Sequence, residues 1–164
     1  MGNPKAIIVM GSENDMPVME EAAKALAELG VPCRMHVASA HRTPEKAAKI
    51  ASGAKDAGVK VIIAGAGYAA HLAGAMAANT TLPIIGVPLD ASSLSGLDSL
   101  LSTVQMPAGL PVATVSIGKT GAKNAGILAA QIIALSDEAV AGKLAEFRKR
   151  MADKVEEADR KISS

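Results

Sequence analysis

Short apolar segments alternate with helix-like segments along most of this 164-residue chain. The apolar segments are rich in β-branched residues and are followed by glycine, proline or small polar residues, as buried strands often are. Successive strands that are joined by helices form a parallel sheet with helices on both faces. We therefore predict an α/β fold. Its five strands span 6–10, 33–38, 59–64, 84–87 and 112–116, and its helices span 16–29, 44–57, 69–79, 92–104 and 122–134.

The second predicted strand differs from the others because apolar and polar residues alternate in it. This alternation is typical of an edge strand with one face in water. Arg34 and His36 would lie on the wet face, so His36 is predicted to be a solvated strand residue. The helix that follows has Thr43 at its expected N-cap and Pro44 at its first position, where the missing N–H costs nothing.

The last part of the chain, 137–164, has a different pattern. Its apolar residues recur at spacings of four and three with charged residues between them: Val140, Leu144, Phe147, Met151, Val155, Ala158 and Ile162. This spacing predicts an amphipathic helix. Such a helix can pack on its own domain or on a neighbouring subunit, and the pattern leaves both open. The chain length predicts a single domain, 1–164, with an α/β core at 5–134.

Charged residues are distributed unevenly. From Val61 to Gly118 the only charged residues are Asp90 and Asp98, although 20% of the whole chain is charged. A domain of this size has too little interior to bury so long an uncharged segment. Large exposed apolar surfaces on soluble proteins usually mark interfaces. We therefore predict a homo-oligomer.

The composition argues against several classes of partner. A net charge of +1 and only two aromatic side chains, Tyr68 and Phe147, are unsuited to nucleic-acid binding. No apolar run approaches the ~20 residues of a membrane span, and no signal peptide is recognisable, so we expect a cytoplasmic protein without membrane contact. The single Cys33 and three well-separated histidines suggest neither a disulfide nor a metal site.

Three loops follow the first three predicted strands, at 11–15, 39–44 and 65–71. The carboxyl ends of parallel strands lie at one edge of the sheet, where α/β folds bind ligands. The loops would bring together one carboxylate, two imidazoles and one guanidinium, which belong to Asp15, His41, His71 and Arg42. A guanidinium binds phosphate through paired hydrogen bonds, and an imidazole transfers protons near neutral pH. This set favours a small phosphorylated sugar derivative and general acid–base chemistry.

Each of these loops also has a simpler explanation. Ser12 and Asp15 can be helix caps. The segment 39–44 can be a surface turn, and His71 can be a buried histidine that is satisfied by the backbone. The sequence Gly-Ala-Gly at 65–67 resembles only half of a dinucleotide-binding fingerprint, and no P-loop motif is present. The three loops together therefore indicate a ligand site, whereas no single loop does.

Several longer motifs occur in order along the chain: 10–15 (Met-Gly-Ser-Glu-Asn-Asp), 39–44 (Ser-Ala-His-Arg-Thr-Pro), 64–67 (Ala-Gly-Ala-Gly), 69–72 (Ala-Ala-His-Leu), 83–88 (Pro-Ile-Ile-Gly-Val-Pro), 98–102 (Asp-Ser-Leu-Leu-Ser) and 105–107 (Gln-Met-Pro). In these motifs, from about residue 5 to residue 134, the chain resembles the class I members of the aminoimidazole ribonucleotide carboxylase family, the N5-carboxyaminoimidazole ribonucleotide mutases. The resemblance implies a flavodoxin-like three-layer sandwich. It also implies a homo-octamer with active sites between subunits, in which the C-terminal helix reaches a neighbour.

The same resemblance implies an isomerase of purine biosynthesis that moves a carboxylate from the exocyclic N5 to ring carbon C4, without metal, ATP or organic cofactor. Its partners would be a ribonucleotide substrate and, functionally, the ATP-dependent synthetase that makes this substrate. By matching positions, His41 would be the acid–base residue. The other implied site residues are Ser12, Asp15, Arg42 and Ser39 at the ribose phosphate, with Ala40 in the same motif, and Gly67, Ala70, His71 and Leu72 around the base and carboxylate.

Two positions depart from the family pattern. Tyr68 and Ala73 stand where the family has glycine and proline, which leaves the choice of substrate open. Two alternative functions also fit the residues: an aminoimidazole ribonucleotide carboxylase that uses CO₂ directly, and a non-catalytic module that binds a nucleoside monophosphate. The direct carboxylases usually carry lysine where this chain has Arg42, and this difference favours the mutase.

Overall fold

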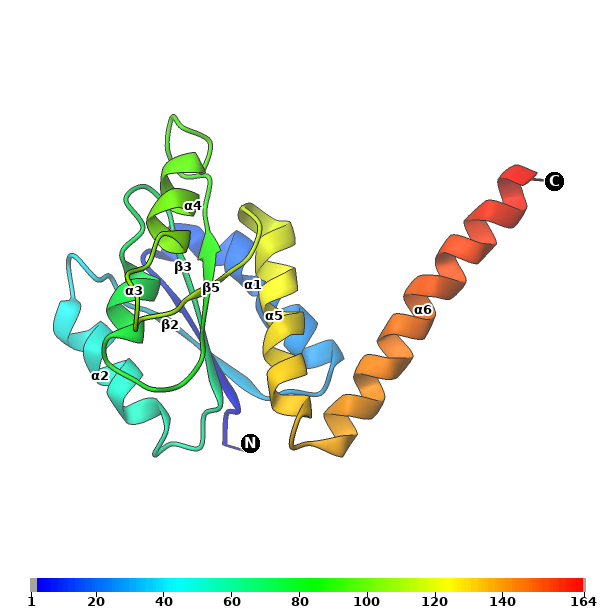
Figure 1. Ribbon diagram of the computed structural model, residues 1–164, viewed down its shortest axis with the longest axis horizontal. Helices are drawn as coiled ribbons and strands as arrows, with labels where there is room; N and C mark the ends of the chain where they lie inside the picture. Colours follow the sequence, from blue (N-terminus) through cyan, green and yellow to red (C-terminus); the bar gives the residue numbers. More distant parts are fainter. Residues whose placement is uncertain (1–2, 164) are drawn as a thin grey trace.

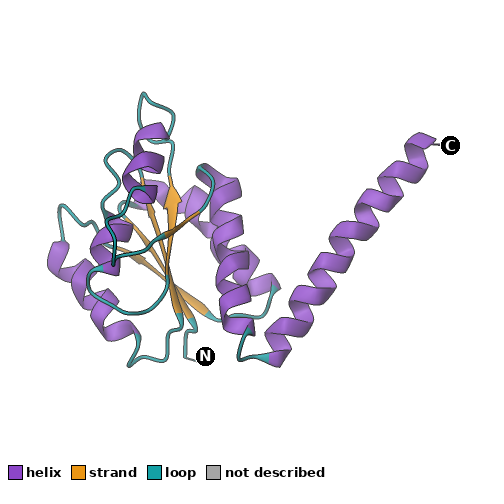
Figure 2. Cartoon of the chain, in the orientation of Figure 1, coloured by secondary structure: helices purple, strands orange, loops and turns teal. Residues whose placement is uncertain are grey.

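The computed structural model describes residues 3–163 and contains a five-stranded parallel sheet between two layers of helices (Figure 1, Figure 2). The strand order is β2-β1-β3-β4-β5. This order is that of flavodoxin-like folds, so the predicted three-layer sandwich is confirmed. Residues 1, 2 and 164 of the predicted domain lie outside the described residues.

The chain builds the sheet and its helices by regular alternation. In chain order the elements are β1 (Ala6–Met10), the short 3₁₀ helix η1 (Glu13–Asp15), α1 (Met16–Glu28), β2 (Cys33–Val37), α2 (Pro44–Ala54), β3 (Val61–Ala66), α3 (Leu72–Ala77), β4 (Ile84–Pro88), α4 (Leu97–Val104), β5 (Ala113–Thr114), α5 (Gly118–Ala134) and α6 (Glu138–Ser163).

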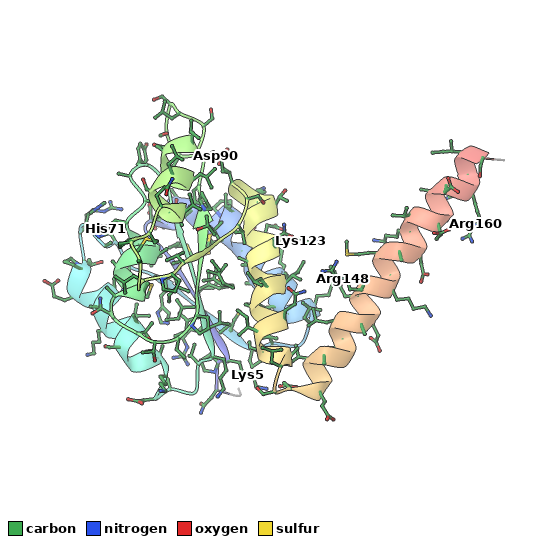
Figure 3. All side chains as sticks on the ribbon, viewed as in Figure 1. Lys5, His71, Asp90, Lys123, Arg148 and Arg160 are labelled. Atoms are coloured by element: carbon green, nitrogen blue, oxygen red, sulfur yellow. The ribbon has the colours of Figure 1, made fainter. Side chains whose placement is uncertain are left out.

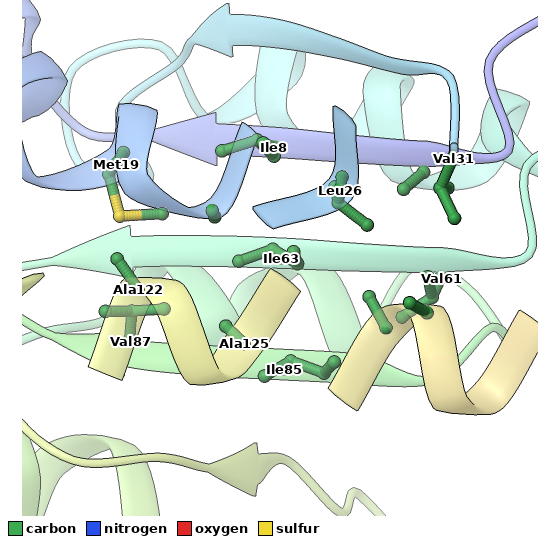
Figure 4. Packing of buried hydrophobic residues seen from close by; sticks show 14 of the residues in the cluster. Ile8, Met19, Leu26, Val31, Val61, Ile63, Ile85, Val87, Ala122 and Ala125 are labelled. Carbon is green, nitrogen blue, oxygen red and sulfur yellow. The ribbon is translucent and has the colours of Figure 1, made fainter. Parts of the chain in front are cut away.

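The central strands are buried on both faces, as their continuous apolar sequences predict. Successive side chains of a strand point to opposite faces of the sheet. Ile8 and Ile63 therefore pack with Met19 of α1 and with alanines of α5 (Figure 4). Ile7 and Ile62 point the other way and pack with alanines of α2 and α3. The sheet thus separates two apolar clusters and fixes the positions of all the strand ends.

β2 lies at the edge of the sheet, as its alternating sequence predicts. Arg34 is exposed, whereas Cys33 and Met35 pack against the core. His36 is partly buried, so it is less solvated than predicted but not enclosed in the core. Burial, together with the nearby charges of Arg34 and Lys46, lowers the pKa of His36 below its ordinary value of 6.5. This imidazole is therefore neutral at pH 7.

Two helices begin later than predicted, and the backbone before each of them contains a residue in the left-handed conformation. The helix predicted at 69–79 is α3, which begins at Leu72, and Tyr68 before it has a φ of 56°. The helix predicted at 92–104 is α4, which begins at Leu97, and Ser95 and Gly96 before it have φ values of 49° and 84°. The positive φ values of Ser95 and Gly96 interrupt the right-handed backbone inside the predicted range 92–104, whereas Tyr68 lies just before the predicted start at 69.

The remaining differences lie at the ends of elements. The strand predicted at 59–64 is shifted by two residues in β3, because Val61 pairs with the first residue of β1 and Ala66 still pairs with Pro88. The strand predicted at 112–116 is reduced to the two residues of β5, which pair only with β4. An edge strand has only one neighbour to hold it in the ladder. α5 begins at Gly118, before the predicted 122, and α2 ends at Ala54, before the predicted 57.

α6 leaves the domain as a long projecting helix (Figure 1). Val140 and Phe147 in its first half are buried against the core, whereas every residue from 148 to 163 is exposed. The first half of α6 thus packs on its own domain. Within residues 3–163, none of the helices combines the length and apolar character that crossing a bilayer demands.

An ion pair between Lys5 and Asp137 holds the start of α6 against the start of β1. Asp137 also caps α6, because its Oδ1 accepts the N–H of Val140 at 3.2 Å. Both residues lie at the same end of the sheet, where Figure 3 shows Lys5 beside the start of α6. The Lys5 ammonium, and then the capped N–H groups, lower the pKa of Asp137 below its ordinary 3.8.

We expect the Asp137→Asn variant to unfold about 1–3 °C below the wild type at pH 7, because asparagine can still cap α6 but cannot pair with Lys5. A carboxyl whose pKa is lowered by folding stabilises the protein above its unfolded pKa and loses this effect as the pH falls through its folded pKa. The difference should therefore begin to shrink as the pH falls past 3.8 and disappear at still lower pH, once the folded carboxyl is protonated. Thermal unfolding from pH 7 to pH 3, with Asp56→Asn as the control, measures this. A difference that is the same at both pH values would contradict the role of the ion pair.

Candidate functional site

A cavity of about 710 Å³ opens at the carboxyl edge of the sheet. The loops after β1, β2 and β3 form it, together with Ala91 from the segment after β4. Figure 3 shows His71 toward the opposite end of the sheet from Lys5. Nine of the ten predicted site residues line the cavity: Ser12, Asp15, Ser39, Ala40, His41, Arg42, Gly67, His71 and Leu72.

The register of the strands explains why the three loops meet. Met10, the last residue of β1, pairs with Val37 at the end of β2 and with Gly65 near the end of β3. The loops therefore leave the sheet at the same level. β1 lies between β2 and β3, so the connections that follow β1 and β3 run in opposite directions and leave a crevice between them.

Ala70 is the predicted site residue that does not line the cavity. It is only 7% exposed, and its N–H donates to the carbonyl of Tyr68 at 2.8 Å. The other lining residues Gly11, Asn14, Ala66, Tyr68 and Ala69 belong to the three predicted loops, and of the described lining residues only Ala91 belongs neither to those loops nor to the predicted site residues. Ala91 follows β4, which is the neighbour of β3, so a fourth loop at the same edge was the signal that could have identified it.

The loop after β1 contains the helix caps that the sequence suggested. Oδ2 of Asp15 accepts the N–H of Ser12 at 3.0 Å, and Oγ of Ser12 accepts the N–H of Asn14 at 3.3 Å. Both residues also line the cavity, so capping holds them in place at the site. Burial raises the pKa of Asp15 above its ordinary 3.8, although the Ser12 N–H and the charge of Arg42 oppose this effect. A ligand hydroxyl group would supply this poorly hydrated carboxylate with a further donor.

The loop after β2 is closed by its own hydroxyl groups. Oγ of Ser39 accepts the N–H of Arg42 at 3.2 Å. Thr43 occupies the N-cap of α2, but its side chain does not cap the helix as predicted. Its Oγ1 instead accepts the N–H of Ser39 at 2.9 Å and donates to the Ser39 carbonyl at 3.2 Å. These bonds hold the short turn that presents His41 and Arg42.

Arg42 connects this loop to the loop after β1. Its Nη2 donates to the carbonyl oxygen of Gly11 at 3.0 Å. A guanidinium has five N–H donors in a planar fork, so this bond orients the group and leaves other donors available for an anion. Arg42 lines the cavity beside Ser12 and Ser39. Together these residues can bind a phosphate group.

Two imidazoles from different loops meet at the cavity. Nε2 of His41 lies 3.3 Å from Nδ1 of His71, and the ring centroids are 5.2 Å apart. Both side chains are exposed, so the alternative of a buried His71 that is satisfied by the backbone is wrong. A hydrogen bond between two imidazole nitrogens requires one to carry the hydrogen and the other to accept it. His71 can therefore orient the His41 ring and exchange a proton with it.

The described residues contain no group of three or more His, Cys, Asp or Glu side chains that could hold a metal ion. Cys33 lies on β2, away from the cavity lining, and burial raises the pKa of its thiol. The polar groups that line the cavity are thus a guanidinium, a carboxylate, an amide, hydroxyls and two imidazoles. They can bind a phosphate and sugar hydroxyls, and they can transfer a proton.

Comparisons with known proteins find relatives that match almost the whole chain. The model of the AIR carboxylase family matches residues 5–154. The chain is 55% identical to the N5-carboxyaminoimidazole ribonucleotide mutase of Bacillus subtilis (strain 168), over 94% of this chain and 96% of that protein. It is 52% identical to the protein of the same name from Mycobacterium tuberculosis (strain ATCC 25618 / H37Rv), over 97% of this chain and 90% of that protein.

A solved structure extends the comparison from sequence to fold. The crystal structure of Treponema denticola PurE is 30% identical to this chain and superposes with a TM-score of 0.88, covering 98% of this chain and 99% of that chain. The family match includes all three cavity-forming loops and most of α6. A family model that matches residues 5–154 covers most of the chain, and this chain belongs to the AIR carboxylase family.

Proposed function

We propose that the protein is an N5-carboxyaminoimidazole ribonucleotide mutase, an isomerase that forms 4-carboxy-5-aminoimidazole ribonucleotide in purine biosynthesis. The identity of 52–55%, over nearly the whole chain, to relatives named for this activity carries the proposal. The cavity supports it, because an imidazole pair, a guanidinium and a half-buried carboxylate face one space.

In the proposed reaction His41 transfers a proton twice. Breaking the bond between N5 and the carboxylate carbon releases CO₂, and N5 takes a proton from the protonated imidazole. C4 then forms a bond to the retained CO₂, and His41 removes the proton that C4 carried. The two transfers balance, so the enzyme returns to its starting state. The uncharged side of the cavity, formed by Ala66, Gly67, Leu72 and Ala91, suits the retention of neutral CO₂ between the two steps.

The other polar groups bind the ribose phosphate in this proposal. Arg42 and the hydroxyls of Ser12 and Ser39 bind the phosphate, and Asp15 accepts hydrogen bonds from ribose hydroxyls. The bond from Arg42 to Gly11 fixes the distance between the two loops that hold the phosphate. His71, at 3.3 Å, keeps the His41 ring in the orientation that proton transfer requires.

The direct carboxylase remains the alternative because the matching family is named for that reaction. Both reactions need the same ribonucleotide site, but they differ in the source of the carboxylate. Arg42 and the mutase-named relatives favour the mutase. The third function, binding without catalysis, leaves the imidazole pair without a role.

Incubation with two substrates tests the proposal. The purified protein is given N5-carboxyaminoimidazole ribonucleotide in one reaction, and aminoimidazole ribonucleotide with bicarbonate in the other. Rapid formation of the C4-carboxylated product in the first reaction alone is the expected result. Efficient product formation in the second reaction would instead identify the direct carboxylase. If neither reaction gave product, the remaining function would be binding of a nucleoside monophosphate without catalysis.

We further propose a homo-octamer with sites between subunits, located in the cytoplasm and functionally linked to the ATP-dependent synthetase that makes the substrate. α4 presents Leu97, Leu101 and Val104, which are 53%, 49% and 50% exposed. Their spacing places them on one face of the helix. The projecting half of α6 adds the exposed Met151 and Val155. Uncovered apolar rows on a soluble protein support association between copies, for which both helices are candidate surfaces.

A single charge on the α4 row should reduce the size of the assembly. We expect Leu101→Glu to change the molar mass from that of an oligomer toward the 16.5 kDa of one chain, because an apolar interface cannot hydrate an unpaired carboxylate. Size-exclusion chromatography with light scattering measures this. Ser52→Glu, on the exposed side of α2, is the control and should not change the mass. An unchanged oligomer in both Leu97→Glu and Leu101→Glu would exclude the α4 row as an interface.

A further inference from the structure

Tyr68 combines an aromatic side chain at the cavity with a left-handed backbone conformation. It lines the cavity, and its side chain is 64% exposed. Its φ of 56° lies in the left-handed region, which a bulky side chain rarely adopts. The chain has one tyrosine, one phenylalanine and no tryptophan, and Phe147 of α6 is buried against the core. Tyr68 therefore carries the single phenyl-type ring that faces the cavity.

The loop that carries Tyr68 is anchored on both sides. Before it, the carbonyl of Ala66 accepts the N–H of Leu89 at 3.0 Å. Gly67 lies so close to the next segment that a Cβ there would be 2.6 Å from Cβ of Ala91. After it, Ala70 and Leu72 are buried. The ring is thus exposed on a short loop whose backbone has little freedom to move, which is the condition for preorganised binding.

We propose that Tyr68 is the stacking surface for the planar imidazole ring of the substrate, and that it selects ring-bearing ribonucleotides over sugar phosphates without a base. The inference rests on the proposed function, because it assigns the base of the proposed substrate to one side of the cavity. Arg42 and Asp15 then hold the ribose phosphate, and Tyr68 contacts a part of the ligand that these two residues do not. Aromatic side chains stack on the faces of planar heterocycles whatever their ring substituents. This contact does not need a hydrogen-bond partner.

The expected effect on affinity is moderate and selective. Removal of an aromatic side chain from a stacked base weakens binding about 5- to 150-fold, and an imidazole ring is smaller than a nucleobase. We therefore expect the loss of the Tyr68 ring to weaken the binding of aminoimidazole ribonucleotide about 10-fold. Ribose 5-phosphate has no ring to stack, so its affinity should change less than about twofold.

Calorimetric titration of the full-length protein with both ligands tests the inference. The variants are Tyr68→Phe, which keeps a ring, and Tyr68→Gly and Tyr68→Asn, which lack a ring and tolerate a positive φ. The stacking role predicts that only the ring-free variants lose affinity, and only for aminoimidazole ribonucleotide. Equal weakening of both ligands would show that Tyr68 shapes the loop. A loss in Tyr68→Phe as large as in Tyr68→Gly would show that the phenol hydroxyl makes the contact. Either result overturns the proposal.

Two further measurements distinguish a misfolded variant, a failure of the stacking role and a failure of the proposed function. Thermal unfolding shows whether the variants are folded, and Tyr68→Gly should unfold no earlier than the wild type because glycine relieves the positive φ. Conversion of N5-carboxyaminoimidazole ribonucleotide by the wild type tests the proposed function independently of Tyr68. A wild type that converts this substrate, with ring-free variants of unchanged affinity, refutes the stacking role and keeps the mutase. A wild type that binds ribose 5-phosphate as tightly as aminoimidazole ribonucleotide also refutes it.

Discussion

Replacement of His41 with asparagine is expected to lower the kcat of the mutase reaction about 1000-fold, because a general acid–base residue contributes roughly 10²- to 10⁴-fold and His41 makes both proton transfers in the proposed reaction. Asparagine preserves the size of the side chain and can hydrogen-bond to His71, but it cannot carry a proton between N5 and C4. The phosphate contacts of Arg42 and Ser39 are unchanged, so substrate affinity should stay within about threefold.

The chain offers a matched control for this variant. His36 lies on β2, is neutral at pH 7 and does not line the cavity, so His36→Asn should retain most of the activity. His41 is exposed, and its replacement should change the free energy of unfolding by about 0.5 kcal/mol or less. Steady-state rates and thermal unfolding of both variants provide the comparison. A folded His41→Asn protein with the wild-type rate would falsify the acid–base role of His41.

The largest expected effect on stability is at Gly126, in the middle of α5. A Cβ at this position would be 2.6 Å from the carbonyl oxygen of Ala22 and 2.9 Å from Cβ of Ala25, both in α1. Glycine thus allows the two helices to pack with their backbones close together. Valine would force them apart over the apolar cluster, and we expect Gly126→Val to lower the free energy of unfolding by about 3 kcal/mol.

Gly53 in α2 is the control for this substitution. Nothing lies within 4 Å of a Cβ built there, so alanine adds helix propensity without a clash. Gly53→Ala should be neutral or raise the free energy of unfolding by up to about 0.5 kcal/mol. Urea denaturation at one protein concentration measures both variants, since association would otherwise shift the midpoints. Equal stability of Gly126→Val and the wild type would show that α1 and α5 can move apart at little cost.

Most of the fold could be predicted because it is encoded in local patterns. Continuous apolar segments identified β1, β3 and β4, and alternation identified β2 as an edge strand. The starts of α3 and α4 were predicted too early. Tyr68 and Ser95 have positive φ values, and neither is a residue whose identity indicates that conformation. The surrounding structure imposes these values, so residue preferences could not reveal them.

The residue types of the site could be predicted well from the sequence. The positions of these residues relative to one another could be predicted less well. Loops after successive parallel strands had to meet at one edge, and nine of the ten selected residues do line the cavity. The motifs also led to the correct family, which the match over residues 5–154 confirms. Two positions differ from the prediction, because Ala70 lies outside the lining and Ala91 lies within it. Both outcomes depend on how the loop after β3 folds against the loop after β4.

The sequence by itself determined the layers of this protein and the chemical groups available to it, because apolar periodicity and side-chain chemistry are properties of short segments. Only the tertiary structure decided that His41 and His71, which are 30 positions apart, lie 3.3 Å from each other. It also decided that capping groups such as Asp15 face a cavity. Distances between remote residues depend on strand order and register, and these are set by the packing of the whole sheet between its helices.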